Sequence, residues 1–357
     1  MENNKIALIT YSLSSGGLER VVANSSFMFS SLGYEVHIFV INSSVDYQYK
    51  AILHCYNLDK LSVNDKVKAY QSLKKDIQSH QFKLIIDHRY RLNKFTEFYW
   101  QKCIYANQNV LLYVHSSNIY SYLFQSNYFN QILFKNRKFI CVSEGIETII
   151  NKNHPSLQTQ TIYNVIDINS NKISIDIKGE YIVTIGRMDR SNVKQIDVLL
   201  KCYAKSLLPK NDVKLCIIGD GVRLTEMQQL AKELKIEDLV IFKGFLDKPF
   251  VYLKNALFTV LASKYEGLPT VLIESLFVDT PVISFDCETG PNEIIVNNVN
   301  GVLVENQNKK EFINALNKLY SDKVFYNNIK AEIKNTINKF ESTTILNKWN
   351  KILNDIN

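Results

Sequence analysis

Ser263-Lys264-Tyr265-Glu266-Gly267-Leu268-Pro269-Thr270-Val271-Leu272-Ile273-Glu274 is the most informative stretch of the sequence. An apolar run that ends near Leu261 precedes it and predicts a strand, and a short loop then carries Glu266 and Gly267. Proline is favoured at the first position of a helix, so we expect a helix to begin around Pro269. Strand, short loop and helix in this order are typical of an α/β fold.

The same alternation extends outward from this stretch through most of the chain. The apolar runs are nearly continuous in Val, Ile and Leu, which is typical of parallel strands covered by helices on both faces. In the first half we expect strands at Ile6–Thr10, Glu35–Val40, Leu84–Asp87, Val110–His115 and Phe139–Ser143, and a helix at Leu18–Leu32. In the second half we expect strands at Tyr181–Ile185, Val213–Ile218, Leu239–Phe242, Leu257–Leu261 and Pro281–Phe285, and helices at Val193–Lys205, Arg223–Leu234, Pro269–Phe277 and Lys309–Tyr320.

The chain length of 357 residues favours two domains, because a single core usually stops growing below about 250–300 residues. A polar stretch, Asn164–Lys178, separates the two series of elements and is the expected linker. We therefore expect two doubly wound, Rossmann-like domains, at residues 1–168 and 178–338, which face each other across a cleft. Residues 339–357 are expected to form a terminal helix that returns to the N-terminal domain.

Composition narrows the class of protein. No run approaches the roughly 18–20 apolar residues that a membrane span needs, and the first strand begins almost at Met1, so we expect a cytoplasmic protein. A formal net charge of +7 suggests an anionic partner such as a diphosphate or a phospholipid surface. Nucleic acid is not expected, since no zinc finger, RNP-like motif or dense basic run is present.

The cysteines and histidines give no sign of a metal site. The six cysteines, Cys55, Cys103, Cys141, Cys202, Cys216 and Cys287, include no CxxC pair, and reduced structural thiols are expected. The six histidines are equally scattered, at His37, His54, His80, His88, His115 and His154. The sequence therefore predicts no bound metal and no cofactor.

The expected helix after Pro269 has the chemistry of an anion site. Free amides and the positive end of the helix dipole attract a diphosphate. Glu274 lies about one and a half turns into the helix, and helical side chains lean toward the N-terminus. Its neighbours are apolar, so a carboxylate there needs polar partners such as ribose hydroxyls. Glu266 and Glu274 taken singly could equally be solvated carboxylates.

Several motifs in the same order resemble those of a known family. Glu266 and Glu274, around Gly267-Leu268-Pro269, resemble the E-x7-E signature of the retaining GT-B glycosyltransferases of family four, also called glycosyl transferases group 1. The further matches, along nearly the whole chain, are Ser15-Gly16-Gly17-Leu18-Glu19-Arg20, Tyr113-Val114-His115-Ser116, Ile162-Tyr163-Asn164-Val165-Ile166-Asp167, Ile185-Gly186-Arg187 with Lys194, Gly219-Asp220-Gly221 and Thr289-Gly290-Pro291-Asn292-Glu293. Two positions depart from the family: Val165 replaces a proline, and Gln195 replaces the glycine after Lys194.

The resemblance implies a role for each matching residue. Catalysis would involve His115, Arg187, Lys194 and Glu266, with Arg187 and Lys194 neutralising the donor diphosphate, Glu266 contacting the donor sugar and His115 donating a hydrogen bond near the reacting carbon. Donor binding would involve Gly16, Gly17, Arg187, Lys194, Phe242, Gly244, Gly267, Leu268, Pro269, Thr270 and Glu274. The acceptor would lie near His88, Arg89 and Arg91, in the first half. No metal ion would be required.

Plainer interpretations of these residues stay open. His115 could be a core or loop histidine, Arg187 and Lys194 a solvated basic face, and Gly16-Gly17 only a turn. The stretch Tyr120–Lys138 holds many aromatic residues followed by Lys135, Arg137 and Lys138. It could be core with a polar rim, or a surface that contacts an anionic membrane peripherally.

The resemblance implies a hexosyltransferase. It would move a hexose or N-acetylhexosamine from a nucleotide sugar, UDP-linked by expectation, to a glycan or lipid-linked glycan in bacterial surface polysaccharide or lipopolysaccharide synthesis. The alternatives are a nucleotide-sugar epimerase or a non-catalytic glycan-binding subunit on the same fold. A nicotinamide-dependent oxidoreductase is excluded, because Ser14-Ser15-Gly16-Gly17 is not G-x-G-x-x-G and the second strand lacks a ribose-binding acid.

Overall fold

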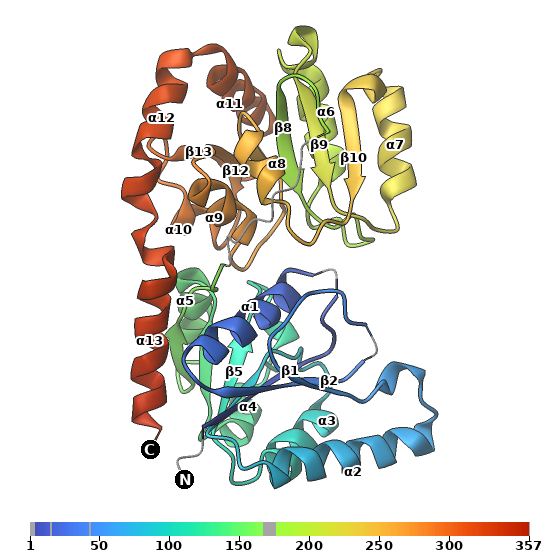
Figure 1. Cartoon of the computed structure of the whole chain (residues 1–357), viewed down its shortest axis with the longest axis vertical. Coiled ribbons are helices and arrows are strands. Elements are labelled where there is room, and N and C mark those ends of the chain that lie inside the picture. The colour runs from blue at the N-terminus through green and yellow to red at the C-terminus, as the bar shows by residue number, and fades with distance from the viewer. Residues whose placement is uncertain (1–3, 15, 43, 167–175, 357) are drawn as a thin grey trace. The chain divides into compact units, whose positions relative to one another are not determined.

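The computed structural model describes residues 4–14, 16–42, 44–166 and 176–356. The chain forms two compact units (Figure 1). The first unit consists of residues 1–165 and 342–357, and the second unit consists of residues 166–341. Most of the expected linker, residues 167–175, lies outside the described residues.

In its described residues the first unit is built around a seven-stranded parallel sheet with the order β3-β2-β1-β4-β5-β6-β7. Its strands are β1 (Lys5–Thr10), β2 (Glu35–Val40), β3 (Ile52–Cys55), β4 (Leu84–Asp87), β5 (Val110–Val114), β6 (Lys138–Cys141) and β7 (Gln158–Thr161). Its α-helices are α1 (Gly17–Ser31), α2 (Val63–Ser79), α3 (Lys94–Tyr99), α4 (Asn127–Leu133), α5 (Glu144–Asn153) and α13 (Ser342–Asp355). A π-helical turn, Trp100–Ile104, continues α3.

The described part of the second unit repeats the scheme with a six-stranded parallel sheet of order β10-β9-β8-β11-β12-β13. Its strands are β8 (Tyr181–Ile185), β9 (Lys214–Ile218), β10 (Val240–Gly244), β11 (Thr259–Leu261), β12 (Val282–Asp286) and β13 (Gly301–Glu305). Its α-helices are α6 (Ile196–Lys205), α7 (Leu224–Glu233), α8 (Phe250–Asn255), α9 (Thr270–Phe277), α10 (Pro291–Ile294), α11 (Lys309–Ser321) and α12 (Lys323–Thr336).

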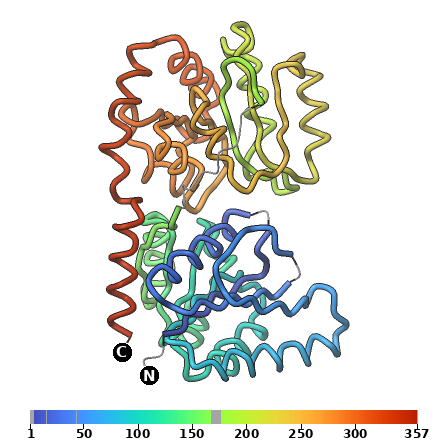
Figure 2. The backbone as a smooth tube through the Cα atoms, in the orientation of Figure 1, coloured from blue at the N-terminus to red at the C-terminus, as the bar shows by residue number. Residues whose placement is uncertain are grey.

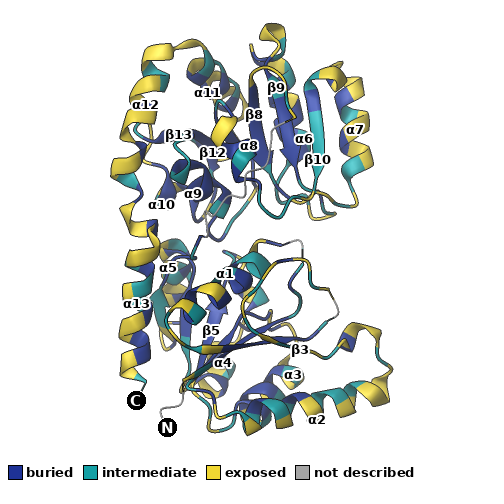
Figure 3. Cartoon of the chain, viewed as in Figure 1, coloured by how far each residue is buried: buried dark blue, intermediate teal, exposed yellow. Residues whose placement is uncertain are grey.

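The central strands of both sheets are buried on both faces (Figure 3). All four residues of β4 and the first four of β8 are buried, and successive side chains of a strand point to opposite faces. Helices must therefore cover both faces of each sheet, as in doubly wound folds. The predicted α/β class with two Rossmann-like sheets is confirmed.

The last helix belongs to the first unit. Figure 2 traces α13, in red, from the end of the second unit back to the first. The Trp349 ring of α13 is buried and meets Phe29 of α1 edge to face, with 5.0 Å between ring centroids. Burial of a large aromatic side chain in such a pair anchors the helix.

One helix begins later than the sequence predicts. The expected helix Val193–Lys205 starts only at Ile196. Gln195 has a left-handed backbone, with φ of 45°, and the carbonyl of Val193 accepts a hydrogen bond from the amide of Lys264 at 2.8 Å. A left-handed residue cannot continue a right-handed helix, so residues 193–195 form a turn instead.

Candidate functional site

The second sheet has its topological switch point between β8 and β11. These strands are neighbours, but the chain continues from β8 to β9 on one side and from β11 to β12 on the other. Ligands of open α/β sheets bind at the carboxyl ends of the strands beside such a point. Arg187 follows β8 and Glu266 follows β11, so the two predicted residues lie on the two sides of this crevice.

Lys194 and Glu266 meet at this point. The Lys194 ammonium donates a hydrogen bond to the Glu266 carboxylate at 2.5 Å, and their side chains are 25% and 10% exposed. The bond between Lys264 and Val193 joins the two loops and brings these side chains together. Gly186 leaves room for the lysine, because a Cβ there would lie 2.8 Å from Lys194 Cγ.

Gln195 occupies a place where glycine is usual in the family that the sequence resembles, and it keeps the glycine-like backbone. Its φ of 45° lies in the left-handed region that glycine enters freely. The substitution thus preserves the turn that carries Lys194. Arg187 is free of this packing: its side chain is 52% exposed, and its Nε lies 4.0 Å from the Asp189 carboxylate.

The loop after β12 contacts the loop that carries Glu266 and fixes its position. Thr289 Oγ1 donates to the carbonyl of Glu266 at 2.6 Å. Gly290 has φ of 94°, and a Cβ there would lie 2.6 Å from Pro269 Cδ and 2.9 Å from the Gly267 carbonyl oxygen. Because only glycine fits this position without strain, the two loops interlock and fix the Glu266 backbone.

Helix α9 begins directly after these loops. Pro269 precedes its first residue, Thr270, and Gly267 and Leu268 are buried beside it. Glu274, the fifth residue of α9, is 3% exposed and leans toward the N-terminal end, as helical side chains do. The helix thus offers an anion-binding end with a buried carboxylate one turn behind it.

The sequence analysis did not identify two polar side chains at the carboxyl ends of the strands of this sheet. Ser263 Oγ and Asp286 Oδ1 are buried and, within the described residues, have no hydrogen-bond partner. Ser263 follows β11 and Asp286 ends β12, the neighbouring strand. Burial raises the pKa of Asp286. Buried polar groups without partners are costly, which favours a ligand at this edge of the sheet.

Phe242 and Gly244, which were expected to take part in donor binding, lie at the end of β10. Gly244 has φ of 68°, and its carbonyl accepts from the Gly219 amide at 2.8 Å. Gly219 has no room for a side chain, since a Cβ would lie 2.1 Å from the Gly186 carbonyl oxygen. The Phe242 side chain is partly buried and packs against the core.

In the first unit, Gly16 and Gly17 open helix α1. The carboxylate of Glu19 folds over this end, and its Oε2 lies 1.9 Å from the place of a Cβ on Gly16. A helix N-terminus attracts negative charge, and here Glu19 supplies it. A phosphate that binds these amides would have to displace Glu19.

His115 and His88 form a pair at the carboxyl ends of β5 and β4, in which His88 is buried and His115 is partly exposed. His88 Nδ1 and His115 Nε2 are 2.9 Å apart. Burial lowers the pKa of His88 to about 3, and burial, His88 and Arg91 lower the pKa of His115 well below its usual range. Both rings are therefore neutral at physiological pH, so His115 can donate or accept a hydrogen bond but carries no charge.

The assignment of Arg89 and Arg91 to the acceptor is not supported. Both side chains are 1% exposed. Arg89 makes a two-pronged bond to Asp87, at 3.0 and 2.8 Å, and stacks on Trp100 with 3.5 Å to the ring centroid. Arg91 donates to the carbonyls of Tyr113 and Asp87. His88 is buried too, so these three residues form part of the interior.

The aromatic stretch Tyr120–Lys138 holds both buried and exposed side chains. Tyr122, Phe124 and Phe134 are buried, whereas Tyr120 and Tyr128 are 46% and 73% exposed. Arg137 is not a free surface charge. Its guanidinium donates to the Gln101 side chain and to the carbonyls of Gln108 and Tyr105.

Proteins similar to this chain include glycosyltransferases. Residues 165–336 match the family described as glycosyl transferases group 1. Over 96% of its length the chain is 28% identical to a Campylobacter jejuni protein, N-acetylgalactosamine-N,N'-diacetylbacillosaminyl-diphospho-undecaprenol 4-alpha-N-acetylgalactosaminyltransferase, and covers 97% of it. It is 27% identical over 221 residues to the lipopolysaccharide 1,6-galactosyltransferase of Escherichia coli K12, which is 60% of each chain.

Solved structures share the fold. Anabaena HepE in complex with UDP and glucose superposes with a TM-score of 0.78 at 17% identity, covering 98% of this chain and 99% of that one. The pneumococcal O-GlcNAc transferase GtfA in complex with UDP and GlcNAc gives a TM-score of 0.79 at 12% identity, covering 100% and 99%. The two parallel, Rossmann-like sheets of this chain match the GT-B fold of such glycosyltransferase structures.

Proposed function

Residues 165–336 match the glycosyl transferases group 1 family and the chain is a glycosyltransferase, and from that premise we propose its donor, acceptor and stereochemistry. The donor is a nucleotide sugar with UDP as the nucleotide and a hexose or N-acetylhexosamine as the sugar. The acceptor is a glycan or lipid-linked glycan of the bacterial surface. Transfer retains the configuration of the anomeric carbon and needs no metal ion.

One observation carries the proposal: Lys194 pairs with Glu266 at the switch point between β8 and β11, where Arg187 follows β8 and α9 begins after the loop that carries Glu266. A diphosphate at the α9 N-terminus would lie beside two cationic side chains, which can stabilise the charge that develops on the leaving phosphate. The relatives support the choice of UDP and of a surface glycan, since UDP-bound and lipopolysaccharide-modifying enzymes are among them.

The Lys194–Glu266 pair suggests how the donor is received. Without a donor, each charge of the pair compensates the other. A diphosphate would draw the Lys194 ammonium toward itself, which frees the Glu266 carboxylate to accept hydrogen bonds from sugar hydroxyls. The partner exchange keeps both charges paired before and after binding, so neither is left buried alone.

Retention follows most simply from attack on the side that the nucleotide leaves. The acceptor hydroxyl oxygen forms the new bond to the anomeric carbon while the bond from that carbon to the phosphate oxygen breaks. The departing phosphate takes the hydroxyl proton. Arg187 and Lys194 would hold that phosphate in place, and neutral His115 would contribute a hydrogen bond to the sugar without adding charge.

The experiment is a panel of UDP- and GDP-sugars tested for slow hydrolysis by the purified chain, with the product anomer read by NMR during transfer to an acceptor. We expect hydrolysis of one or a few UDP-sugars and an α-linked product from an α-linked donor. A β-linked product would overturn retention. Preference for GDP-sugars would overturn the choice of nucleotide, and hydrolysis of none, without a thermal shift, would overturn the donor assignment.

A second observation favours a membrane-borne acceptor: exposed apolar side chains gather around α3 and α4. The Lys94 ammonium of α3 lies 5.4 Å from the Phe129 ring centroid of α4, and the Arg91 amide donates to Ser121 at 2.8 Å. These contacts join a patch whose exposed large hydrophobic residues are Tyr90, Leu92, Phe95, Phe98, Tyr120, Tyr128 and Ile132. We call this set the apolar patch.

Charge around the apolar patch suits an anionic surface. Between residues 90 and 138 the sequence has a single carboxylate, Glu97, and it is 1% exposed and paired with Arg89. Lys94, Lys102 and Lys135 are exposed in the same segment. Apolar side chains flanked by lysines without competing carboxylates are typical of surfaces that bind anionic bilayers. Among the described residues, no helix is both long and apolar enough to span a membrane.

Vesicle sedimentation tests this contact. Replacing Phe95 and Phe98 by Ser should reduce binding to vesicles that contain anionic lipid, and replacing Lys94 and Lys135 by Ser should cost about 1 kcal/mol per charge, most strongly at low salt. Ser at Val222 and Val324, exposed valines of the second unit, is the matched control. Equal sedimentation of all four proteins, or none for the wild type, would overturn the membrane contact without affecting the donor site.

A further inference from the structure

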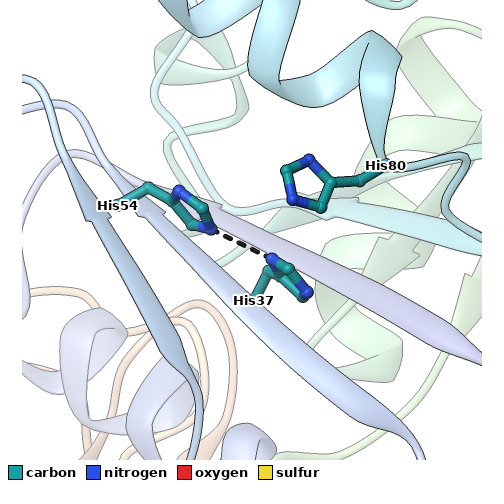
Figure 4. Close-up of side chains that lie close together, drawn as sticks. All are labelled: His37, His54 and His80. Carbon is teal, nitrogen blue, oxygen red and sulfur yellow. Dashed lines mark hydrogen bonds between the residues drawn. The ribbon is translucent and has the colours of Figure 1, made fainter.

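The structure brings together three histidines that are far apart in the sequence. His37 lies on β2, His54 on β3 and His80 directly after α2. Figure 4 shows the three rings converging, and one nitrogen of each lies within 4.8 Å of the others. The expectation that the histidines are too scattered for a metal site is therefore wrong for these three, because strand pairing and the end of α2 place them together.

Strand register explains the approach of the first two rings. β2 and β3 run parallel, with His37 opposite Ile52 and Phe39 opposite His54. Residues two apart on a strand share a face, so His37 and His54 lie on the same face of the sheet. Phe39 and Phe82 pack beside them, with Phe82 5.1 Å from the His37 centroid. The cluster therefore has a fixed, largely apolar wall.

Neighbouring acceptors fix which nitrogens of His37 and His80 are free. The Glu35 carboxylate lies 2.9 Å from His37 Nε2 and also forms an ion pair with the Lys5 ammonium at 2.9 Å. The carbonyl of Asp76 lies 2.7 Å from His80 Nδ1. Both partners can only accept, so these nitrogens carry protons, and in the neutral rings His37 Nδ1 and His80 Nε2 carry the lone pairs.

The third ring faces one of these lone pairs. His54 Nε2 lies 3.0 Å from His37 Nδ1. Two ligands of a tetrahedral zinc ion, each at about 2.0–2.1 Å from the metal, are separated by a similar distance.

We propose that His37, His54 and His80 bind a divalent transition-metal ion, with Zn²⁺ as the physiological ion and water as the fourth ligand. Three imidazole nitrogens suit Zn²⁺, whereas Mg²⁺ and Ca²⁺ prefer oxygen. Glu35 and the Asp76 carbonyl act as the outer partners that orient metal-binding histidines in such sites.

The ion has a structural role. His80 precedes β4 and His88 follows it, so the trio and the His88–His115 pair belong to opposite ends of that strand. The ion would tie edge strand β3 and the end of α2 to β2. Edge strands are held on one side only, so a metal clip stabilises this part of the first unit without entering the glycosyl transfer.

The test uses full-length protein without an affinity tag, stripped of metal and titrated with Zn²⁺ and with Co²⁺ as a spectroscopic probe. We expect uptake of one equivalent, a visible Co²⁺ spectrum typical of tetrahedral coordination, and a rise of the unfolding temperature with Zn²⁺. His80→Gln and His54→Gln should lose the spectrum and the stabilisation. These two side chains are only partly buried, so both variants should fold.

Two further variants separate a metal site from simple histidine packing. Glu35→Gln removes the charge behind His37 and should weaken Zn²⁺ binding by about tenfold to a hundredfold. His154→Gln alters a buried histidine elsewhere and should leave uptake unchanged. The proposal fails if the wild type binds no more Zn²⁺ than His80→Gln, or if His154→Gln lowers the uptake as much as His80→Gln does.

Discussion

The two units share a strand order but use the carboxyl ends of their sheets differently. In both, the first strand lies beside the fourth, and the charged residues follow those strands. In the second unit Arg187 is half exposed and Lys194 and Glu266 form a partly exposed pair. In the first unit Asp87, Arg89, Arg91 and Glu97 are all at most 1% exposed.

This difference distinguishes charged side chains that are open to a ligand from charged side chains that stabilise the fold. A buried network in which each charge already has partners offers nothing to a ligand, and its members depend on one another. An open cation beside a helix N-terminus keeps its affinity for an anionic ligand. Similar topology therefore predicts where charged residues gather, whereas burial and pairing decide what they do.

The largest expected effect is on the stability of the first unit. Arg89→Ala removes the two-pronged bond to Asp87 and the stacking on Trp100, and leaves the Asp87 carboxylate buried. Breaking a buried ion pair in this way typically costs about 3–5 kcal/mol. Urea unfolding of wild type and variant measures the loss.

The matched control is Arg190→Ala, which removes an exposed arginine of the second unit. Its free energy of unfolding should stay within about 0.5 kcal/mol of wild type, as for most surface substitutions. If Arg89→Ala is as stable as this control, the buried network does not hold the fold, and the contrast between the units is lost.

The next effect is on activity, at the second unit. Arg187→Ala or Lys194→Ala should lower kcat/KM for the glycosyl donor by about 10²–10³, the usual cost of removing one group that stabilises transition-state charge. Unfolding should stay close to wild type, since Arg187 is half exposed. Steady-state kinetics with the donor found in the hydrolysis panel measures the loss.

Lys264→Ala and Arg190→Ala are controls of matched charge, since both residues are exposed on neighbouring loops. Both should keep near-wild-type kcat/KM. A variant at Arg187 or Lys194 that retains more than about a tenth of wild-type kcat/KM, a loss below roughly 1.4 kcal/mol, would remove that residue from the phosphate-binding pair.

The sequence predicts the interior of the fold better than its edges. Every predicted strand corresponds to a strand of the structure, whereas β3, β7 and β13 were not predicted. All three are edge strands, and β3 and β7 have no buried residue. Gln158-Thr159-Gln160-Thr161 carries no apolar signal, because hydrophobic pattern reports burial, and an edge strand needs little of it.

In the candidate site, too, the sequence predicts local features and misses contacts that depend on the fold. Glu266, Gly267 and Pro269 are close in sequence, so local spacing could predict their turn and helix. Arg89 and Arg91 were expected near the acceptor. The sequence could not show that they are buried, because their contacts with Glu97 and Trp100, which come from another element, depend on the fold. His37, His54 and His80 were missed for the same reason: strand register, which local spacing does not report, brings them together.

The smallest expected effect is that of removing metal. In the proposed site the cations of the second unit and the α9 N-terminus would supply the positive charge for the diphosphate, so saturating EDTA should leave kcat/KM unchanged. If the histidine trio binds Zn²⁺, EDTA should lower the unfolding temperature, so activity is measured well below that temperature.

His80→Gln is the control, since its activity and stability should not respond to chelator. Activity that vanishes with EDTA in both proteins and returns with Mn²⁺ or Mg²⁺ would contradict a metal-independent site. If only the wild type loses activity with EDTA, activity depends on the metal bound by the histidine trio and not on a metal at the ends of β8 and β11. The functional contrast between the two units would then be lost.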